Sequence, residues 1–217
     1  MTEERAKEIA EAMPHDVLRT YVLPAVRCPL TDNLIRKAVQ FYLSADPRLK
    51  NSVIQRFGEI ENWDVSRVTD MCFMFEDATS FNQPLNKWDV SNVTYMNHMF
   101  AGASSFNQPL NKWDVSNVRQ MDRMFNGATS FNQPLNKWDV SNVTDMRYMF
   151  YEASSFNQPL NNWNVSKVTD MERMFRRATS FNQPLNKWNV SNVEKMVCMF
   201  EGATSFDQPL HAPWYVV

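Results

Sequence analysis

The stretch SFNQPLNKWDVSNV recurs along the chain almost unchanged, beginning at Ser80 and then every 25 residues as far as Ser180. Tryptophans keep the same period: Trp63, Trp88, Trp113, Trp138, Trp163 and Trp188 lie 25 residues apart, and Trp214 follows 26 residues later. A fixed period of roughly 20 to 50 residues is typical of arrays in which each unit packs on its neighbours. The sequence therefore predicts a repeat solenoid.

Two hydrophobic periods alternate within one unit. In KWDVS, Trp113 and Val115 are two residues apart, and this alternation predicts a strand. In SNVRQMDRMFNGA the apolar residues fall at steps of three and four, which predicts a short helical segment with Ser116 as its N-cap. TSFNQPLN is typical of a returning loop. The pattern predicts an α/β repeat solenoid, a right-handed coil with short parallel strands and short helical segments.

The ends of the chain depart from the repeat. Residues 1–58 show helical spacing in EERAKEIAEAM and in TDNLIRKAVQFYLSA, with Thr31 or Asp32 as N-cap of the second segment and Pro14 and Pro47 as boundaries. We interpret 1–58 as an N-terminal helical cap, 59–210 as six 25-residue units and 211–217 as a C-terminal edge strand. MPHDVLRTYVLP is similar to the opening of an F-box, which leaves an adaptor function as an alternative to capping.

The C-terminal segment WYVV has strong strand character and follows a break in register. An open edge of this kind is a place for a second chain, which predicts a homodimer through this edge. The alternative is that the segment folds back over the last unit. The residues that would carry self-association are Trp214, Tyr215, Val216 and Val217.

Composition limits the classes of function. The formal net charge of -2 makes nucleic-acid binding an unfavourable interpretation. The three cysteines, Cys28, Cys72 and Cys198, are scattered, which argues against a disulfide framework and a structural zinc site. The sequence has no signal-peptide pattern, lipidation motif or apolar run of membrane-spanning length. We therefore expect an intracellular protein, cytoplasmic or virion-associated, without a membrane partner.

Residues that are the same in all units are expected to have a structural role rather than a catalytic or binding role. The recurrent asparagines, from Asn82 to Asn182, are expected to form amide ladders between units, and the two methionine columns are expected to fill the core. The lysine and aspartate columns of the strand are interpreted as a solvated face. The three histidines are scattered, and no nucleophile–base motif or phosphate-binding glycine loop occurs. We therefore expect no enzyme, no cofactor and no metal.

Positions that vary among the units lie on the outer side of the predicted helical segment. There the middle units gather arginine and tyrosine, which are favoured at protein interfaces. The alternative is neutral variation on a wet surface. The candidate partner-binding residues are Arg119, Arg123, Arg147, Tyr148, Tyr151, Arg173, Arg176 and Arg177.

The unit NKWDVSNVTDMRYMFYEASSFNQPL resembles the 25-residue repeats of BspA-like leucine-rich-repeat proteins, also described as a domain of unknown function in mycoplasma lipoproteins. The resemblance extends from about Ile60 to Leu210 and implies a leucine-rich-repeat-like solenoid used for binding, often on bacterial surfaces, with no catalytic residues. Related repeats occur in protists and large DNA viruses. The leading hypothesis is a non-enzymatic protein–protein interaction scaffold; an F-box-like adaptor and an adhesin-like surface protein are the alternatives.

Overall fold

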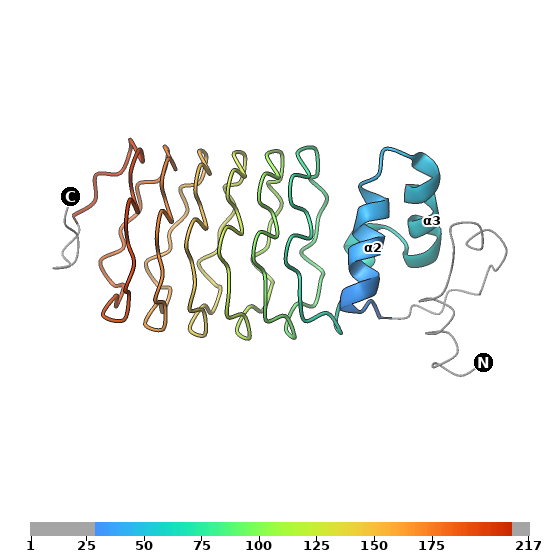
Figure 1. Cartoon of the computed structure of the whole chain (residues 1–217), viewed down its shortest axis with the longest axis horizontal. Helices are drawn as coiled ribbons and strands as arrows, with labels where there is room; N and C mark the ends of the chain where they lie inside the picture. The colour runs from blue at the N-terminus through green and yellow to red at the C-terminus, as the bar shows by residue number, and fades with distance from the viewer. Residues whose placement is uncertain (1–28, 210–217) are drawn as a thin grey trace.

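A computed structural model describes residues 29–209 of the 217-residue chain. It contains two α-helices, α2 (Asp32–Tyr42) and α3 (Pro47–Phe57), followed by a short 3-10 helix, η2 (Ile60–Asn62). The repeats then lie side by side in one row, with the two helices at one end of that row (Figure 1). We call each 25-residue turn of chain a coil; coil 1 begins at Trp63 and coil 6 at Trp188.

Main-chain hydrogen bonds join each coil to the next. Between coils 1 and 2, the N–H groups of four alternate residues donate to carbonyl oxygens 24 residues further on. The donor–acceptor pairs are Met71 to Tyr95, Phe73 to Asn97, Phe75 to Met99 and Asp77 to Ala101, with N···O distances of 2.7–2.9 Å. The same four bonds recur between all later coils of the described chain. Since no coil can form these bonds alone, each one depends on its neighbours for its structure.

The predicted α/β solenoid is wrong, because the described residues contain no β-strand. Successive coils meet in isolated parallel bridges of single residues, from Asp70 with Tyr95 to Asp170 with Lys195. At KWDVS, where a strand is predicted, the main chain bonds locally: the Trp113 N–H donates to the Leu110 oxygen at 3.1 Å. Trp113 and Val115 do both point into the core, so their alternation reports burial and not a sheet.

The predicted helical segments are also wrong and are chains of turns. Arg123 has a φ of 54° and Gly127 a φ of 67°, and the equivalent residues of every other coil also have positive φ. Left-handed residues at every fourth position interrupt an α-helix after one turn. The remaining local bonds span three residues, as from the Met124 N–H to the Met121 oxygen. Steps of three and four therefore mark inward-facing residues of a turn rather than a helix.

Ser116 is not a helix N-cap. Its N–H donates to the Asp114 side chain at 3.0 Å, and the same aspartate or asparagine turn occurs in the other coils. This turn gives the aspartate column a structural role in redirecting the chain after each tryptophan.

The core is a set of stacked columns that runs the length of the row. Phe100 and Phe125 stack at 5.6 Å between ring centroids, and Phe100 stacks on Phe106 of its own coil at 4.1 Å. Each buried tryptophan also donates its indole N–H across the interior, as from Trp113 to the Leu85 oxygen at 2.9 Å. The methionines of coils 1 to 5 are buried, as core filling predicts.

The predicted amide ladder is confirmed. The side-chain oxygen of Asn132 accepts the main-chain N–H of Asn157 at 3.0 Å and the side-chain amide of Gln158 at 2.9 Å. The same pair of bonds links each asparagine of this column to the next coil, from Asn82 to Asn182.

Helix α2 forms where the sequence predicts it, with Thr31 in the N-cap position but without a side-chain capping bond. Helix α3 is missed by the sequence analysis, which treats Pro47 as a boundary; Pro47 is instead the first residue of α3, and Asp46 caps it through the Arg48 N–H. Proline is tolerated at the first position of a helix because the N–H that it lacks would have no partner within the helix there.

Three predictions lie outside the described residues: the first helical segment, the F-box-like stretch and the self-association segment Trp214–Val217. The proposed boundaries at residues 58 and 210 stay predictions. Among the helices that the structure describes, none is long and apolar enough to span a membrane.

Candidate functional site

One wall of the row carries nearly all the differences among coils. We call it the variable wall; it consists of residues 69–77 of coil 1 and the equivalent residues of coils 2 to 6. Its inward residues are buried methionines and phenylalanines, and the residues between them point outward as a set of columns. All eight candidate residues, from Arg119 to Arg177, lie on this wall.

A cation–aromatic stack occupies the middle of the wall. The Tyr148 ring lies between two guanidinium groups, with the Arg123 carbon 4.6 Å and the Arg173 carbon 5.5 Å from its centroid. Arg173 also donates to the Tyr148 hydroxyl and pairs with Glu172. The three residues occupy the same position in coils 3, 4 and 5, so the stacking of coils itself brings them together.

A second group extends this stack toward coil 6. The Tyr151 ring lies 5.7 Å from the Tyr148 ring and 5.9 Å from the guanidinium carbon of Arg176. Arg176 pairs with Glu201 at 2.9 Å, and Arg177 pairs with Glu152 at 2.9 Å. These two arginines are therefore neutralised by the neighbouring coils.

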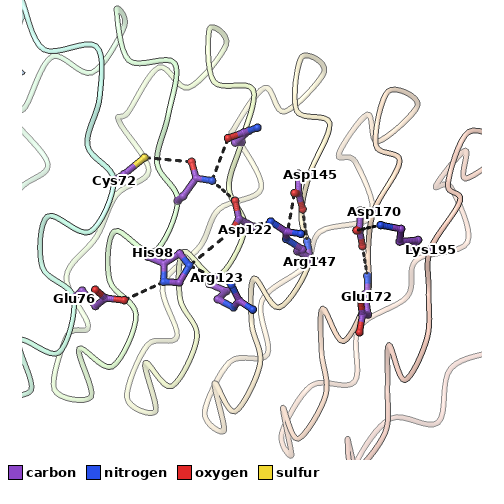
Figure 2. Close-up of polar contacts among 12 residues, drawn as sticks. Cys72, Glu76, His98, Asp122, Arg123, Asp145, Arg147, Asp170, Glu172 and Lys195 are labelled. Atoms are coloured by element: carbon purple, nitrogen blue, oxygen red, sulfur yellow. Dashed lines mark hydrogen bonds and ion pairs between the residues drawn. The ribbon is translucent and has the colours of Figure 1, made fainter.

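Arg147 belongs to a separate polar chain (Figure 2). Its guanidinium lies 3.3 Å from the Asp145 carboxylate and 3.9 Å from that of Asp122. Asp122 is only 3% exposed and accepts a hydrogen bond from Asn97. A buried carboxylate requires such partners, so Arg147 and Asn97 have a structural role here.

Arg119 and Arg123 differ from the other arginines of the set. Among the described residues neither forms an ion pair, and Arg119 is exposed at the start of the wall. Arg123 contacts the Tyr148 face and the His98 ring, whose Nε2 is 3.4 Å from an Arg123 nitrogen. His98 in turn contacts the Glu76 carboxylate through Nδ1 at 3.0 Å (Figure 2).

Sequence analysis of single columns misses the acidic partners on this wall. Glu152, Glu172, Glu201, Asp122 and Asp145 interleave with the arginines, so the wall is largely self-neutralised. A signal was present: residues 24 to 26 apart carry opposite charge or complementary hydrogen-bonding groups. Comparing adjacent repeats would have found the pairs that lie 25 residues apart, which are Arg147–Asp122, Arg176–Glu201 and Arg177–Glu152, whereas Arg147–Asp145 and Arg173–Glu172 lie within one coil.

Burial and neighbours alter the pKa of several groups on the wall. Burial and then the Asp70 carboxylate raise the pKa of the Cys72 thiol to about 12. Burial also raises the pKa of Asp145. Burial opposes ionisation of Asp70 too, but hydrogen bonds from Cys72 and the charge of Arg36 outweigh it and lower the Asp70 pKa.

Two observations describe what chemistry these groups can support. Among residues 29–209 no cluster of three or more histidine, cysteine, aspartate or glutamate side chains could hold a metal ion. The Cys72 thiol is protonated at neutral pH and donates to the Asn97 side-chain oxygen at 3.3 Å, so it is a poor nucleophile. The arrangement is suited to contact: aromatic faces and guanidinium groups held in place by neighbouring coils.

Comparison with known families places the chain. The profile described as "Mycoplasma protein of unknown function, DUF285" matches residues 49–153 and 132–216. The chain belongs to this family. The two overlapping matches cover all six coils and are compatible with a repeat protein; a search of curated proteins and one of solved structures found no match.

Proposed function

We propose that this DUF285 protein is a non-enzymatic scaffold that binds a partner protein through the variable wall, with Arg123, Tyr148 and Arg173 at the centre of the contact. The observation that supports this most is the Tyr148 ring held between two guanidinium groups. Tyrosine and arginine account for a large share of binding energy at protein interfaces. Here they are already ordered, which lowers the entropy lost on binding.

The charges on the wall favour a partner that brings a carboxylate. Arg147, Arg173, Arg176 and Arg177 each have an acidic neighbour. Arg119 and Arg123 have none among residues 29–209, so they are the cations left for a second molecule. We propose that an acidic side chain of the partner pairs with Arg123 while an apolar group packs on the half-buried rings of Tyr148 and Tyr151.

A double charge reversal tests this proposal. The full-length chain and its Arg123→Glu/Arg173→Glu variant are used as baits in extracts of the native source, with Lys112→Glu/Lys137→Glu as a variant of equal charge change on the lysine column. A partner captured by the wild type is then purified, and its Kd is measured for all three proteins. We expect at least a tenfold weaker Kd for the arginine variant and less than a twofold change for the lysine variant.

Arg173 also contacts Glu172 and Tyr148, so the reversal can disturb the wall itself. The milder Arg123→Ala variant, at a residue without an ion pair among the described residues, separates binding from stability. Equal affinity of all variants for the purified partner, with unchanged thermal unfolding, would contradict a role of this wall in binding.

A further inference from the structure

The row of coils has a direction that is fixed by its main chain. In the four rows of bonds that begin at Met71, Phe73, Phe75 and Asp77, every N–H points toward coil 6 and every carbonyl toward the helices. Two flanking rows run the opposite way, as from the Thr94 N–H to the Thr69 oxygen and from the Ser105 N–H to the Thr79 oxygen. The two ends of the row therefore present complementary sets of donors and acceptors.

At the end formed by coil 6, three donors of the forward rows have no acceptor among residues 29–209. They are the main-chain N–H groups of Met196, Cys198 and Gly202. The carbonyls of Glu194 and Thr204, which belong to the reversed rows, likewise receive no hydrogen bond from the described residues. Beside them Val197 is 63% exposed, the most exposed large apolar residue among those described.

At the other end of the row, side chains of α2 form hydrogen bonds with main-chain N–H and carbonyl groups of coil 1. The Asp32 carboxylate accepts the Thr69 N–H at 2.7 Å and the Asp70 N–H at 3.2 Å. The Arg36 guanidinium donates to the Cys72 oxygen at 2.7 Å and pairs with the Asp70 carboxylate at 2.7 Å. A carboxylate thus replaces a carbonyl of an earlier coil, and a guanidinium replaces an N–H.

We propose that the end of coil 6 is a docking surface for coil 1 of a second copy of this chain, and that α2 prevents this docking because it covers coil 1. Two copies that met through coil 6 would oppose donor to donor along the forward rows, which is unfavourable for buried groups. Coil 1 instead presents carbonyls to those donors and the N–H of Thr69 to the carbonyl of Glu194. The rows of Met196, Cys198 and Gly202 match carbonyls of coil 1 because both coils have the same 25-residue design.

Side chains at the two ends support the same pairing. Docking would bring Lys195 to Asp70, the partner that Arg36 now holds, and Val197 to Cys72. Glu201 would meet Glu76, one repulsive contact at the exposed margin. Because the contact is head to tail and each copy keeps a free end, displacement of α2 leads to an open filament and not to a closed dimer.

The test uses full-length chains. Ile35 is a fully buried residue of α2, so Ile35→Asp/Arg36→Ala is designed to detach that helix from coil 1. Sedimentation velocity over a range of concentrations reports association, and amide hydrogen exchange reports protection of Met196, Cys198 and Gly202. The matched control adds Met196→Pro to the same variant, which removes one donor.

We expect the wild type to be a monomer in which the three amides exchange fast. The detached variant should form a concentration-dependent series of oligomers with at least tenfold slower exchange at these amides, and Met196→Pro should weaken association at least tenfold. A wild-type dimer, or a wild-type monomer that protects the three amides, would overturn the proposal. A folded, monomeric detached variant, or oligomers that are insensitive to Met196→Pro, would also overturn it.

The buried charge of Ile35→Asp can itself unfold the chain, which loss of the near-ultraviolet signal of the stacked tryptophans would reveal. Asp32→Ala/Arg36→Ala then serves as the test, because it removes only the polar groups that imitate a coil. Its association constant is expected to exceed that of the wild type at least tenfold, and equal constants would refute the role of α2.

Discussion

The carboxylate of Asp32 accepts a hydrogen bond from the Thr69 N–H, and in every later coil the equivalent N–H donates instead to a main-chain carbonyl of the preceding coil. It accepts the Thr69 N–H at 2.7 Å, and the equivalent N–H of Thr94 is accepted by the Thr69 oxygen at 2.8 Å. A helix thus continues the hydrogen bonding of a repeat through one side chain. The first coil needs this because its donors have no preceding coil.

Replacing Asp32 by alanine should therefore lower the free energy of unfolding by about 1 to 3 kcal/mol, because it leaves the Thr69 N–H without its acceptor. Urea denaturation followed by tryptophan fluorescence measures the change. Asn33→Ala, at the adjacent exposed position of α2, is the control and should shift stability by less than about 0.5 kcal/mol. Equal effects of the two substitutions would show that Asp32 does not act through Thr69.

The amide ladder allows a second prediction. Asn132→Ala removes one oxygen that accepts from both Asn157 and Gln158, and we expect a loss of about 1 to 3 kcal/mol in the free energy of unfolding. Lys137→Ala, an exposed position of the same coil, should change it by less than about 0.5 kcal/mol. A loss no larger than that of the lysine variant would mean that the ladder adds nothing to stability.

The opposite pKa shifts of Asp70 and Asp145 predict opposite pH dependence. The lowered pKa of Asp70 stabilises the fold at neutral pH, and this contribution disappears as the pH falls through that pKa, below about pH 4. The raised pKa of Asp145 has the opposite effect on stability. Its contribution to the free energy of unfolding falls as the pH rises above the ordinary aspartate pKa of about 4, because the folded state disfavours the charged carboxylate.

Thermal unfolding between about pH 3 and pH 7 tests these signs in Asp70→Asn and Asp145→Asn. The loss in Asp70→Asn should be present at pH 7, amount to less than about 1 kcal/mol because the pair is partly exposed, and diminish as the pH falls below about 4. Asp145→Asn should gain relative to the wild type as the pH rises above about 4. Parallel pH profiles for the two variants would exclude this electrostatic account.

The Cys72 thiol should be slow to react. With its pKa raised to about 12 by burial and by Asp70, only a small fraction is thiolate at pH 8, so alkylation should be at least about a hundredfold slower than for an ordinary cysteine. A chain with Cys28→Ser and Cys198→Ser isolates this thiol. Iodoacetamide labelling in buffer and in urea compares the folded and unfolded rates, and similar rates would refute the shift.

Sequence reasoning recovers what each residue does toward the core but not the path of the main chain. The 25-residue period, the inward tryptophan, valine and phenylalanine, the amide ladder and helix α2 all follow from spacing and chemistry. The strands were wrong because the main chain at KWDVS bonds locally, and the helical segments were wrong because Arg123 and its equivalents adopt positive φ. Residues other than glycine rarely adopt positive φ, and the residue types at this position do not indicate it.

The sequence predicted which residues of the candidate surface lie together but not which ion pairs they form. Tyr148 and the two arginines that flank it lie in one column of the repeat, so aligning the units was enough to bring them together. The neutralisation of Arg176 and Arg177 depends instead on side chains of adjacent coils. Arg176 pairs with the following coil and Arg177 with the preceding one, and this choice between two adjacent coils becomes visible only in the structure.

The central claim is that main-chain bonds pass from coil to coil rather than along a helix, and nuclear magnetic resonance measures this directly. Scalar coupling through a hydrogen bond connects the donor nitrogen with the acceptor carbonyl carbon. For the Phe100 N–H, which lies 2.9 Å from the Met124 oxygen, we predict a coupling to the Met124 carbonyl carbon. A coupling to the Met96 carbonyl carbon, as in an α-helix, would contradict the account.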